Sequence, residues 1–198
     1  MKSLLGVVAA YVLLIASLLV GQRAMPIDES TWPAAYDHHF SKYRKRYFGP
    51  FTDWRWFKAQ AIVESNLRPG AVSPDGARGV MQIMPATYRD LHRRYRYLDE
   101  LQGIHWDIAT GIYLDRYLYD KWADRVDDTQ RWWFTFASYN VGFRGMLDAR
   151  RAAREYKKDP TKWSQVSEFV PRETRNYVSR IQRLMGVEFR LPPRRESL

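Results

Sequence analysis

A carboxylate on an otherwise apolar helix face is the feature that most constrains this chain. Trp54, Phe57, Ala61 and Glu64 follow i, i+3, i+7, i+10 spacing, which predicts one shared face of a helix. The first three are apolar or small, so this face should point to a core. An ionised carboxylate is costly there, so its pKa rises and Glu64 can act as a general acid near neutral pH. The alternative is a helix-end Glu that reaches water or pairs with an Arg.

Five short motifs follow one another in the order of a known family. Glu64-Ser65 comes first, and then come Ser73-Pro74-Asp75-Gly76-Ala77, Gly79-Val80-Met81-Gln82-Ile83-Met84-Pro85-Ala86-Thr87, Ala137-Ser138-Tyr139-Asn140-Val141-Gly142 and, last, Glu173-Thr174-Arg175-Asn176-Tyr177-Val178. This ordered set resembles the signature of lytic transglycosylases of the goose-lysozyme-like superfamily, over residues 54–185. Residues 142–154 most resemble the catalytic domains of the membrane-bound lytic transglycosylase F group. Arg78, Val80 and Val141 depart from the family pattern, and Arg78 takes a place that is commonly apolar.

The resemblance implies a single catalytic carboxylate, Glu64. As an acid, it protonates the oxygen of a glycosidic bond, and as a base it then takes the proton of the muramic acid C6 hydroxyl. That hydroxyl closes a 1,6-anhydro ring, so no second carboxylate activates water. The substrate-binding and supporting residues that the resemblance implies are Ser65, Gly79, Met81, Gln82, Tyr139, Asn140 and Tyr177.

Specific contacts are expected for several of these residues. Ser65 should hydrogen-bond near the Glu64 carboxylate or the substrate, Met81 and Gln82 should line the cleft, and Tyr177 should orient Glu64. Simpler structural roles remain open: a helix-terminal hydroxyl for Ser65, a packed side chain for Met81 and a loop brace for Gln82. The corresponding structural alternatives are a tight turn for Gly79 and a helix C-terminus for Asn140.

The predicted fold is mainly α: a lysozyme-like helical domain with a small irregular or β loop region by the active site, plus an N-terminal membrane helix. Asp53 or Thr52 is the expected N-cap of the Glu64 helix, and Asp107 that of a later one. Gly142 should end another helix. The predicted organisation is a signal anchor or signal peptide (1–22), a linker and peripheral helix (23–50), the catalytic domain (51–187) and a tail (188–198).

The N-terminal segment predicts export. Leu4 to Val20 carries no charge and is about as long as the shortest membrane-spanning helices. Small residues are poorly placed for cleavage after Gly21 or Ala24, which favours an uncleaved anchor over a cleaved signal peptide. The expected location is the periplasmic side of the cell envelope, anchored to the inner membrane; the alternative is a soluble exported protein. The helix expected over Tyr36–Tyr47 is either an amphipathic helix near the membrane or a peripheral helix packed on the domain.

Composition and net charge limit the kinds of partner that this chain is expected to bind. The net charge of +10 suits a polyanion such as peptidoglycan or anionic lipid, and no nucleic-acid-binding motif is present, so nucleic acid is not expected. His38, His39, His92 and His105 lack the spacing of a metal site, and no cofactor is expected. The leading function is a lytic transglycosylase acting on peptidoglycan glycan strands, within or outside a larger envelope complex. A water-using muramidase, an inactive peptidoglycan-binding module and a basic membrane- or DNA-binding protein are the alternatives.

Overall fold

Helices make up the regular structure of residues 31–94 and 103–187, the part of the chain that the computed structural model describes. Within these ranges there is no β-strand, only isolated antiparallel bridges in the loop 66–84. The mainly helical prediction is therefore confirmed, while the predicted membrane helix at residues 1–22 lies outside the described residues. In order, the elements are η1 (Ala34–Tyr36), α2 (Asp37–Phe48), α3 (Arg55–Ser65), α4 (Pro85–Arg94), α5 (Gly103–Lys121), α6 (Asp128–Glu155), α7 (Trp163–Val166), η3 (Ser167–Phe169) and α8 (Arg172–Leu184).

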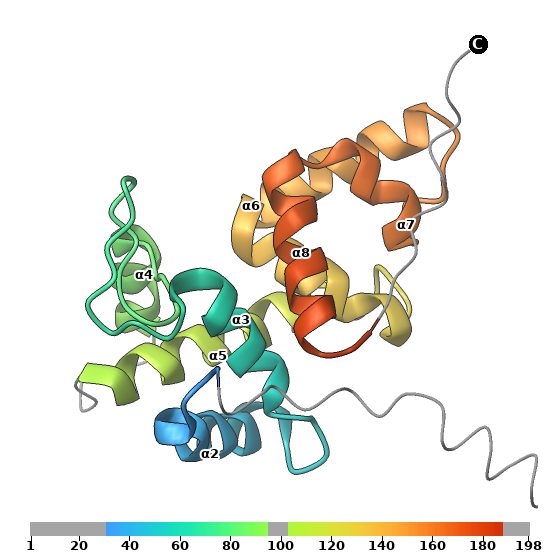
Figure 1. Ribbon diagram of the computed structural model, residues 1–198. Coiled ribbons are helices and arrows are strands. Elements are labelled where there is room, and N and C mark those ends of the chain that lie inside the picture. The colour runs from blue at the N-terminus through green and yellow to red at the C-terminus, as the bar shows by residue number, and fades with distance from the viewer. Residues whose placement is uncertain (1–30, 95–102, 188–198) are drawn as a thin grey trace, which may run out of the picture.

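Helices α3 and α5 join two parts of the molecule (Figure 1). The loop 66–84, called the motif loop below, and α4 lie at one end, and α6, α7 and α8 lie at the other. Helix α8 packs against both α3 and α6, and α6 also packs against α5. The C-terminal end of α3, where Glu64 lies, therefore meets both parts.

Aromatic and branched side chains fill the interior between these helices. Phe57 of α3, Ile108 and Ile112 of α5, and Phe134 and Phe136 of α6 are all fully buried. Burying a side chain of this size contributes roughly 1.5–3 kcal/mol. This packing fixes how α3 is rotated about its axis, and with it the direction of Glu64.

Helix α2 is a peripheral helix packed on the domain, which was one of the two alternatives predicted from the sequence. Phe40 and Tyr43 are buried, and α2 lies against α5 and α3. The buried ammonium of Lys58 on α3 pairs with Asp37 at the start of α2, with 2.7 Å between Nζ and Oδ1. This ion pair compensates the cost of burying the lysine.

The predicted N-cap role of Asp107 is wrong. Helix α5 begins at Gly103, so Asp107 lies inside it, and its buried carboxylate accepts hydrogen bonds from the backbone N–H of Val80 and, at 3.3 Å, of Met81. Burial raises the pKa of Asp107 to about 6, although these two hydrogen bonds lower it. Asp107 thus ties the motif loop to α5 rather than capping a helix.

The expected helix break at Gly142 is present. Gly142 has φ 83° and ψ 150°, so α6 consists of two helical segments that meet at this residue. Glycine takes such a backbone conformation without the clash that a Cβ would cause. Tyr139 and Asn140 lie just before the break, at the end of the first segment.

None of the helices within residues 31–94 and 103–187 is both long and apolar enough to cross a membrane.

Two glycines of the motif loop give a matched test of how closely this loop packs against Asp107 of α5. Both have positive φ, +85° at Gly76 and +80° at Gly79, but a Cβ at Gly76 would meet nothing within 4 Å, whereas one at Gly79 would lie 2.1 Å from Asp107 Oδ2. Gly76→Ala should cost about 1–2 kcal/mol of unfolding free energy, from backbone strain alone. Gly79→Ala should cost at least about 1 kcal/mol more, because it also displaces the Asp107 carboxylate. Urea denaturation measures both; equal losses would mean that the Asp107 contact adds nothing.

Candidate active site

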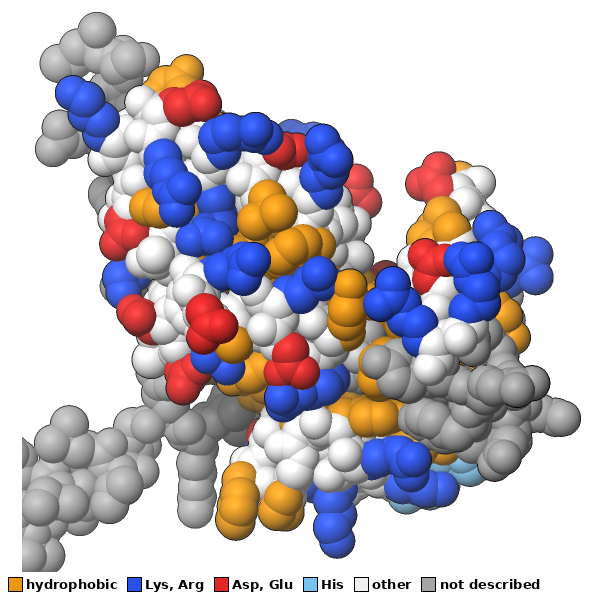
Figure 2. Space-filling view, turned by 180° about the vertical axis from the view of Figure 1, so that it is seen from behind, with side chains coloured by type: hydrophobic (Ala, Val, Ile, Leu, Met, Phe, Trp, Pro, Cys, Tyr) orange, Lys and Arg blue, Asp and Glu red, His pale blue; other side chains and the backbone are white. Residues whose placement is uncertain are grey.

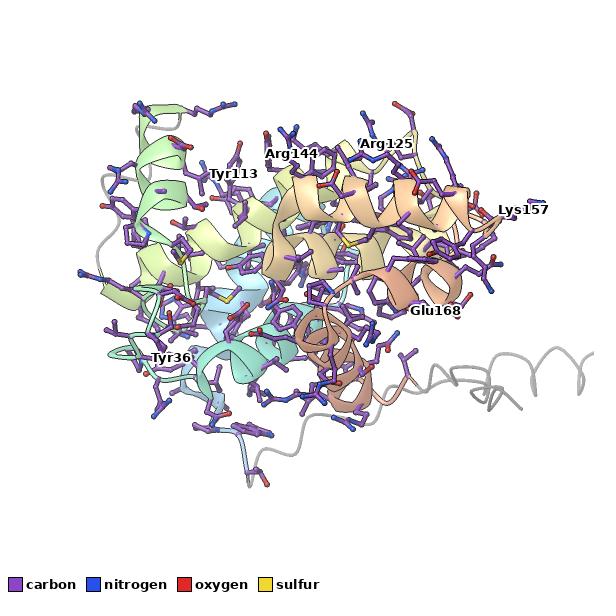
Figure 3. All side chains as sticks on the ribbon, turned by 90° about the horizontal axis from the view of Figure 1, so that it is seen from above. Tyr36, Tyr113, Arg125, Arg144, Lys157 and Glu168 are labelled. Carbon is purple, nitrogen blue, oxygen red and sulfur yellow. The ribbon has the colours of Figure 1, made fainter. Side chains whose placement is uncertain are left out.

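Glu64 lies in a cleft of about 750 Å³, called the Glu64 cleft below. Four parts of the chain line it: the end of α3, the motif loop, the end of the first segment of α6, and α8. Helices α3 and α8, which both contribute to this lining, lie side by side (Figure 3). Among the residues predicted from sequence, the cleft brings together Glu64, Gln82, Tyr139, Asn140 and Tyr177.

The predicted contact between Tyr177 and Glu64 is present. The Tyr177 hydroxyl donates a hydrogen bond to Glu64 Oε1 at 2.6 Å. Glu64 is only partly exposed, and burial raises its pKa to about 7, against the lowering effects of this hydrogen bond and of the Arg180 guanidinium. A carboxyl group with this pKa can donate a proton at neutral pH and later accept one.

A second buried acid lies near Glu64. Asp115 of α5 is fully buried, and its Oδ1 accepts a hydrogen bond from Gln60 Nε2 at 3.2 Å. Burial raises the pKa of Asp115 well above its usual range, and the charge of Glu64 raises it further. Sequence reasoning missed Asp115, although it follows Ile108 and Ile112 at i+7 and i+3, on the same apolar helix face. This is the same type of signal that singled out Glu64.

Ser65 and Met81 are placed differently from the expectation. The buried Ser65 hydroxyl donates to the Val80 carbonyl at 2.8 Å instead of approaching the Glu64 carboxylate. Met81 is fully buried and packs over Gly111 of α5, so its side chain does not line the cleft. The Ser65 side chain thus joins α3 to the motif loop, and the Met81 side chain joins the motif loop to α5.

Three of the remaining supporting residues line the cleft and also form hydrogen bonds to other parts of the protein. The Tyr139 hydroxyl donates to the Met81 carbonyl at 2.7 Å, and Asn140 Oδ1 accepts from the Thr174 hydroxyl at 2.7 Å. Gln82 faces the cleft, but its Nε2 donates to the carbonyls of Gly79 (2.8 Å) and Ala71 (3.2 Å). The loop-brace role considered for Gln82 is thus present beside its cleft position.

Other charged and amide groups also line the cleft. Arg172, Asn176 and Arg180 lie one turn apart along α8, and all three line the cleft. Asp75 and Glu173 also line it, so two exposed carboxylates share the cleft with Glu64. Asp53, by contrast, accepts a hydrogen bond from the backbone N–H of Arg55 at 3.0 Å, but the N-cap residue of α3 is Trp54, so the predicted N-cap at Thr52 or Asp53 is wrong by one or two residues.

Within the described ranges, no group of three or more His, Cys, Asp or Glu side chains is arranged to hold a metal ion.

The sequence profile of one family, described as "Transglycosylase SLT domain", matches residues 49–162. The chain belongs to this family. The match contains α3 with Glu64, the whole motif loop and Tyr139, but ends before α8 and Tyr177.

Similar proteins include longer relatives in bacteria. The chain is 36% identical over 144 residues to "Membrane-bound lytic murein transglycosylase F" of Marinobacter nauticus, covering 68% of this chain and 27% of that protein. A protein of the same name from Serratia proteamaculans is 32% identical over 177 residues, covering 79% of this chain and 35% of that protein. The chain therefore spans about a quarter to a third of the length of these curated relatives.

A solved structure shares the fold. The 70 kDa soluble lytic transglycosylase of Escherichia coli superimposes with a TM-score of 0.61 at 24% sequence identity, covering 79% of this chain and 24% of that one. A complex of the 70 kDa soluble lytic transglycosylase with bulgecin A gives the same TM-score, 0.61, at 23% identity. The lysozyme-like helical arrangement predicted from the sequence is therefore confirmed.

The raised pKa of Glu64 predicts a pH-dependent stability difference. A carboxyl with a pKa of about 7 in the folded state and 4.5 when unfolded binds more protons folded, so it costs stability as pH rises from about 4.5 to 7. Glu64→Gln removes this cost, so the variant should gain stability relative to wild type across that window, by at most about 3 kcal/mol.

Urea denaturation at pH 4.5, 6 and 8 measures this difference, with Glu173→Gln, an exposed carboxylate in the same cleft, as the control. A difference between Glu64→Gln and wild type that does not change with pH would show that Glu64 titrates normally.

Proposed function

We propose that this domain is a peptidoglycan lytic transglycosylase, cleaving the glycosidic bond between MurNAc and GlcNAc without water and leaving 1,6-anhydro-MurNAc ends. The observation that carries this proposal is the Glu64 carboxyl, held by Tyr177 in an open cleft with a pKa of about 7. Membership of the transglycosylase SLT domain family and relatives named lytic murein transglycosylases support it.

In the first step, protonated Glu64 gives its proton to the glycosidic oxygen, and the bond from this oxygen to the MurNAc anomeric carbon breaks. Tyr177 binds Oε1, which leaves Oε2 to face the sugar. In the second step, the Glu64 carboxylate takes the proton of the C6 hydroxyl, whose oxygen bonds to the same anomeric carbon. The proton count balances, because Glu64 ends as it began, protonated. A pKa near neutral lets one group serve both steps.

The roles of the other cleft residues follow from their contacts. Tyr177 is a positioning residue for Glu64, and Asn140, Gln82 and Tyr139 are proposed to border the bound glycan. Ser65, Gly79 and Met81 are proposed to act indirectly, by keeping the motif loop in place. Asp115 is also proposed to act indirectly, because it is buried and its charge would interact with that of Glu64.

A muramidase remains the second candidate because Asp75 and Glu173 line the same cleft. A hydrolase needs a second carboxylate, either to activate water or to form a covalent intermediate. Asp75 lies in the turn that the hydrogen bond from Gly76 N–H to the Ser73 carbonyl closes, and Glu173 lies in the first turn of α8. Both residues face solvent at the cleft.

Product analysis separates these two reactions. Digests of purified peptidoglycan should contain fragments with 1,6-anhydro-MurNAc ends, each lighter by one water than the hydrolytic product, as mass spectrometry measures. Glu64→Gln should reduce their formation by at least about 10²–10⁴-fold, because general acid–base catalysis is lost. Asp75→Asn and Glu173→Gln should keep the product type. Reducing MurNAc ends as the main product, abolished by either of these two variants, would establish the muramidase instead.

We further propose that the domain works on the periplasmic side of the cell envelope, anchored to the inner membrane by residues 1–22. The uncharged segment Leu4 to Val20 and the poorly placed small residues at Gly21 and Ala24 support this, as does the word "membrane-bound" in the names of the relatives. On this view, residues 23–50 link the anchor to a catalytic domain of residues 51–187.

Fractionation of the expressed full-length protein tests the anchor. The mature protein should retain its N-terminus, sediment with membranes and resist extraction by high salt, because an apolar anchor is not held by charge. A soluble form that starts near Ala24 or Met25 would identify the segment as a cleaved signal peptide.

A further inference from the structure

A second cavity, of about 500 Å³, lies outside the Glu64 cleft. We call it the Arg78 cavity; it is lined by Arg78, Ile83, Pro85, Tyr88, Arg89 and Trp106. It shares no lining residue with the Glu64 cleft. Its volume falls within the range of about 300–1,000 Å³ that is usual for small-molecule sites.

A single stretch of the motif loop separates the two cavities and contributes side chains to both. Ala77, Gln82 and Met84 line the Glu64 cleft, whereas Arg78 and Ile83 line the Arg78 cavity. Arg78 and Ile83 pair in an antiparallel bridge, joined by N–H···O hydrogen bonds of 3.1 and 2.9 Å, so their side chains lie on the same face. Alternation along the extended backbone therefore points neighbouring residues into different cavities.

The lining of the Arg78 cavity combines aromatic rings with cations. The rings of Tyr88 and Trp106 lie 4.4 Å apart between centroids and provide an apolar surface. The guanidinium groups of Arg78 and Arg89 are exposed, and neither forms an ion pair with any side chain in the described part of the chain. Among the residues that the structure describes, no carboxylate belongs to the lining. This chemistry fits a ligand with a flat ring face and carboxylate groups.

We propose that the Arg78 cavity is a second binding site for peptidoglycan, which takes a peptide-bearing sugar through ring contact with Tyr88 and Trp106 and carboxylate contact with Arg78 and Arg89. This inference rests on the proposed function. Lys and Arg side chains are spread over both parts of the molecule (Figure 2), so charge alone would not select this cavity; the aromatic pair does. A second contact point would hold the wall polymer near the Glu64 cleft and raise its local concentration.

Binding to purified peptidoglycan tests this site without catalysis. The full-length Glu64→Gln protein in detergent is sedimented with intact peptidoglycan and with peptidoglycan whose stem peptides an amidase has removed. Adding Arg78→Ala and Arg89→Ala should raise the apparent Kd for intact peptidoglycan by about tenfold, because two charge-assisted contacts are lost. On peptide-free peptidoglycan, the same pair of substitutions should change little, because the carboxylates are gone.

Two controls make the result specific. Lys45→Ala with Arg144→Ala removes the same charge from exposed positions outside both cavities, and should leave binding within about twofold of the parent. Trp106→Leu removes the ring but keeps an apolar side chain, and should weaken binding to intact peptidoglycan; its melting temperature reports whether it folds.

The outcomes separate this inference from the proposed function. With Glu64 restored, the Arg78→Ala, Arg89→Ala protein should still convert short soluble glycan strands at the wild-type rate, because these fill only the Glu64 cleft. Failure of the wild type to produce anhydro ends would overturn the function, whatever the binding result. Unchanged binding of the double variant to intact peptidoglycan, or an equal loss on peptide-free material and in the Lys45, Arg144 control, would overturn the second site.

Discussion

The geometry of the site depends on side-chain hydrogen bonds that hold an irregular loop to three helices. Asp107 of α5 accepts from the N–H groups of Val80 and Met81, Ser65 of α3 donates to the Val80 carbonyl, and Tyr139 of α6 donates to the Met81 carbonyl. The motif loop has only isolated β-bridges, so its backbone groups cannot satisfy one another as a sheet would. Buried polar groups without partners cost about 1–3 kcal/mol each, which makes these contacts hard to exchange for others.

The same arrangement explains the presence of two glycines that lie away from the Glu64 carboxyl. Gly79 lies where a Cβ would meet the Asp107 carboxylate, and Gly111 lies where one would meet the Met81 side chain. Both glycines allow the loop and α5 to approach closely. The loop can then form one wall of the Glu64 cleft while its other face lines the Arg78 cavity.

The electrostatics of the site arise from burial more than from charge pairing. Burial raises the pKa of Glu64, Asp107 and Asp115, three carboxyl groups on α3 and α5, and the basic Arg180 offsets this only partly at Glu64. Desolvation disfavours the ionised form of each, while the one hydrogen bond from Tyr177 keeps Glu64 oriented. In a chain with net charge +10, burial thus shifts the pKa of all three carboxyl groups upward.

The sequence by itself determined the helical class, the helix carrying Glu64 and the break at Gly142, because periodicity and glycine conformation are local signals. The Tyr177 partner of Glu64 was expected only from the resemblance of its motif to the family, since the two residues lie far apart in the chain. Only the tertiary structure decided where the motif side chains point. Ser65 and Met81 face the interior, and Asp107 hydrogen-bonds to the motif loop instead of capping a helix. The reason is that backbone groups of the loop need hydrogen-bond partners from the helices around it. Such partners lie 15–27 residues away in the chain. Spacing along a single segment cannot reveal them, since burial and hydrogen bonding depend on what the rest of the fold brings near.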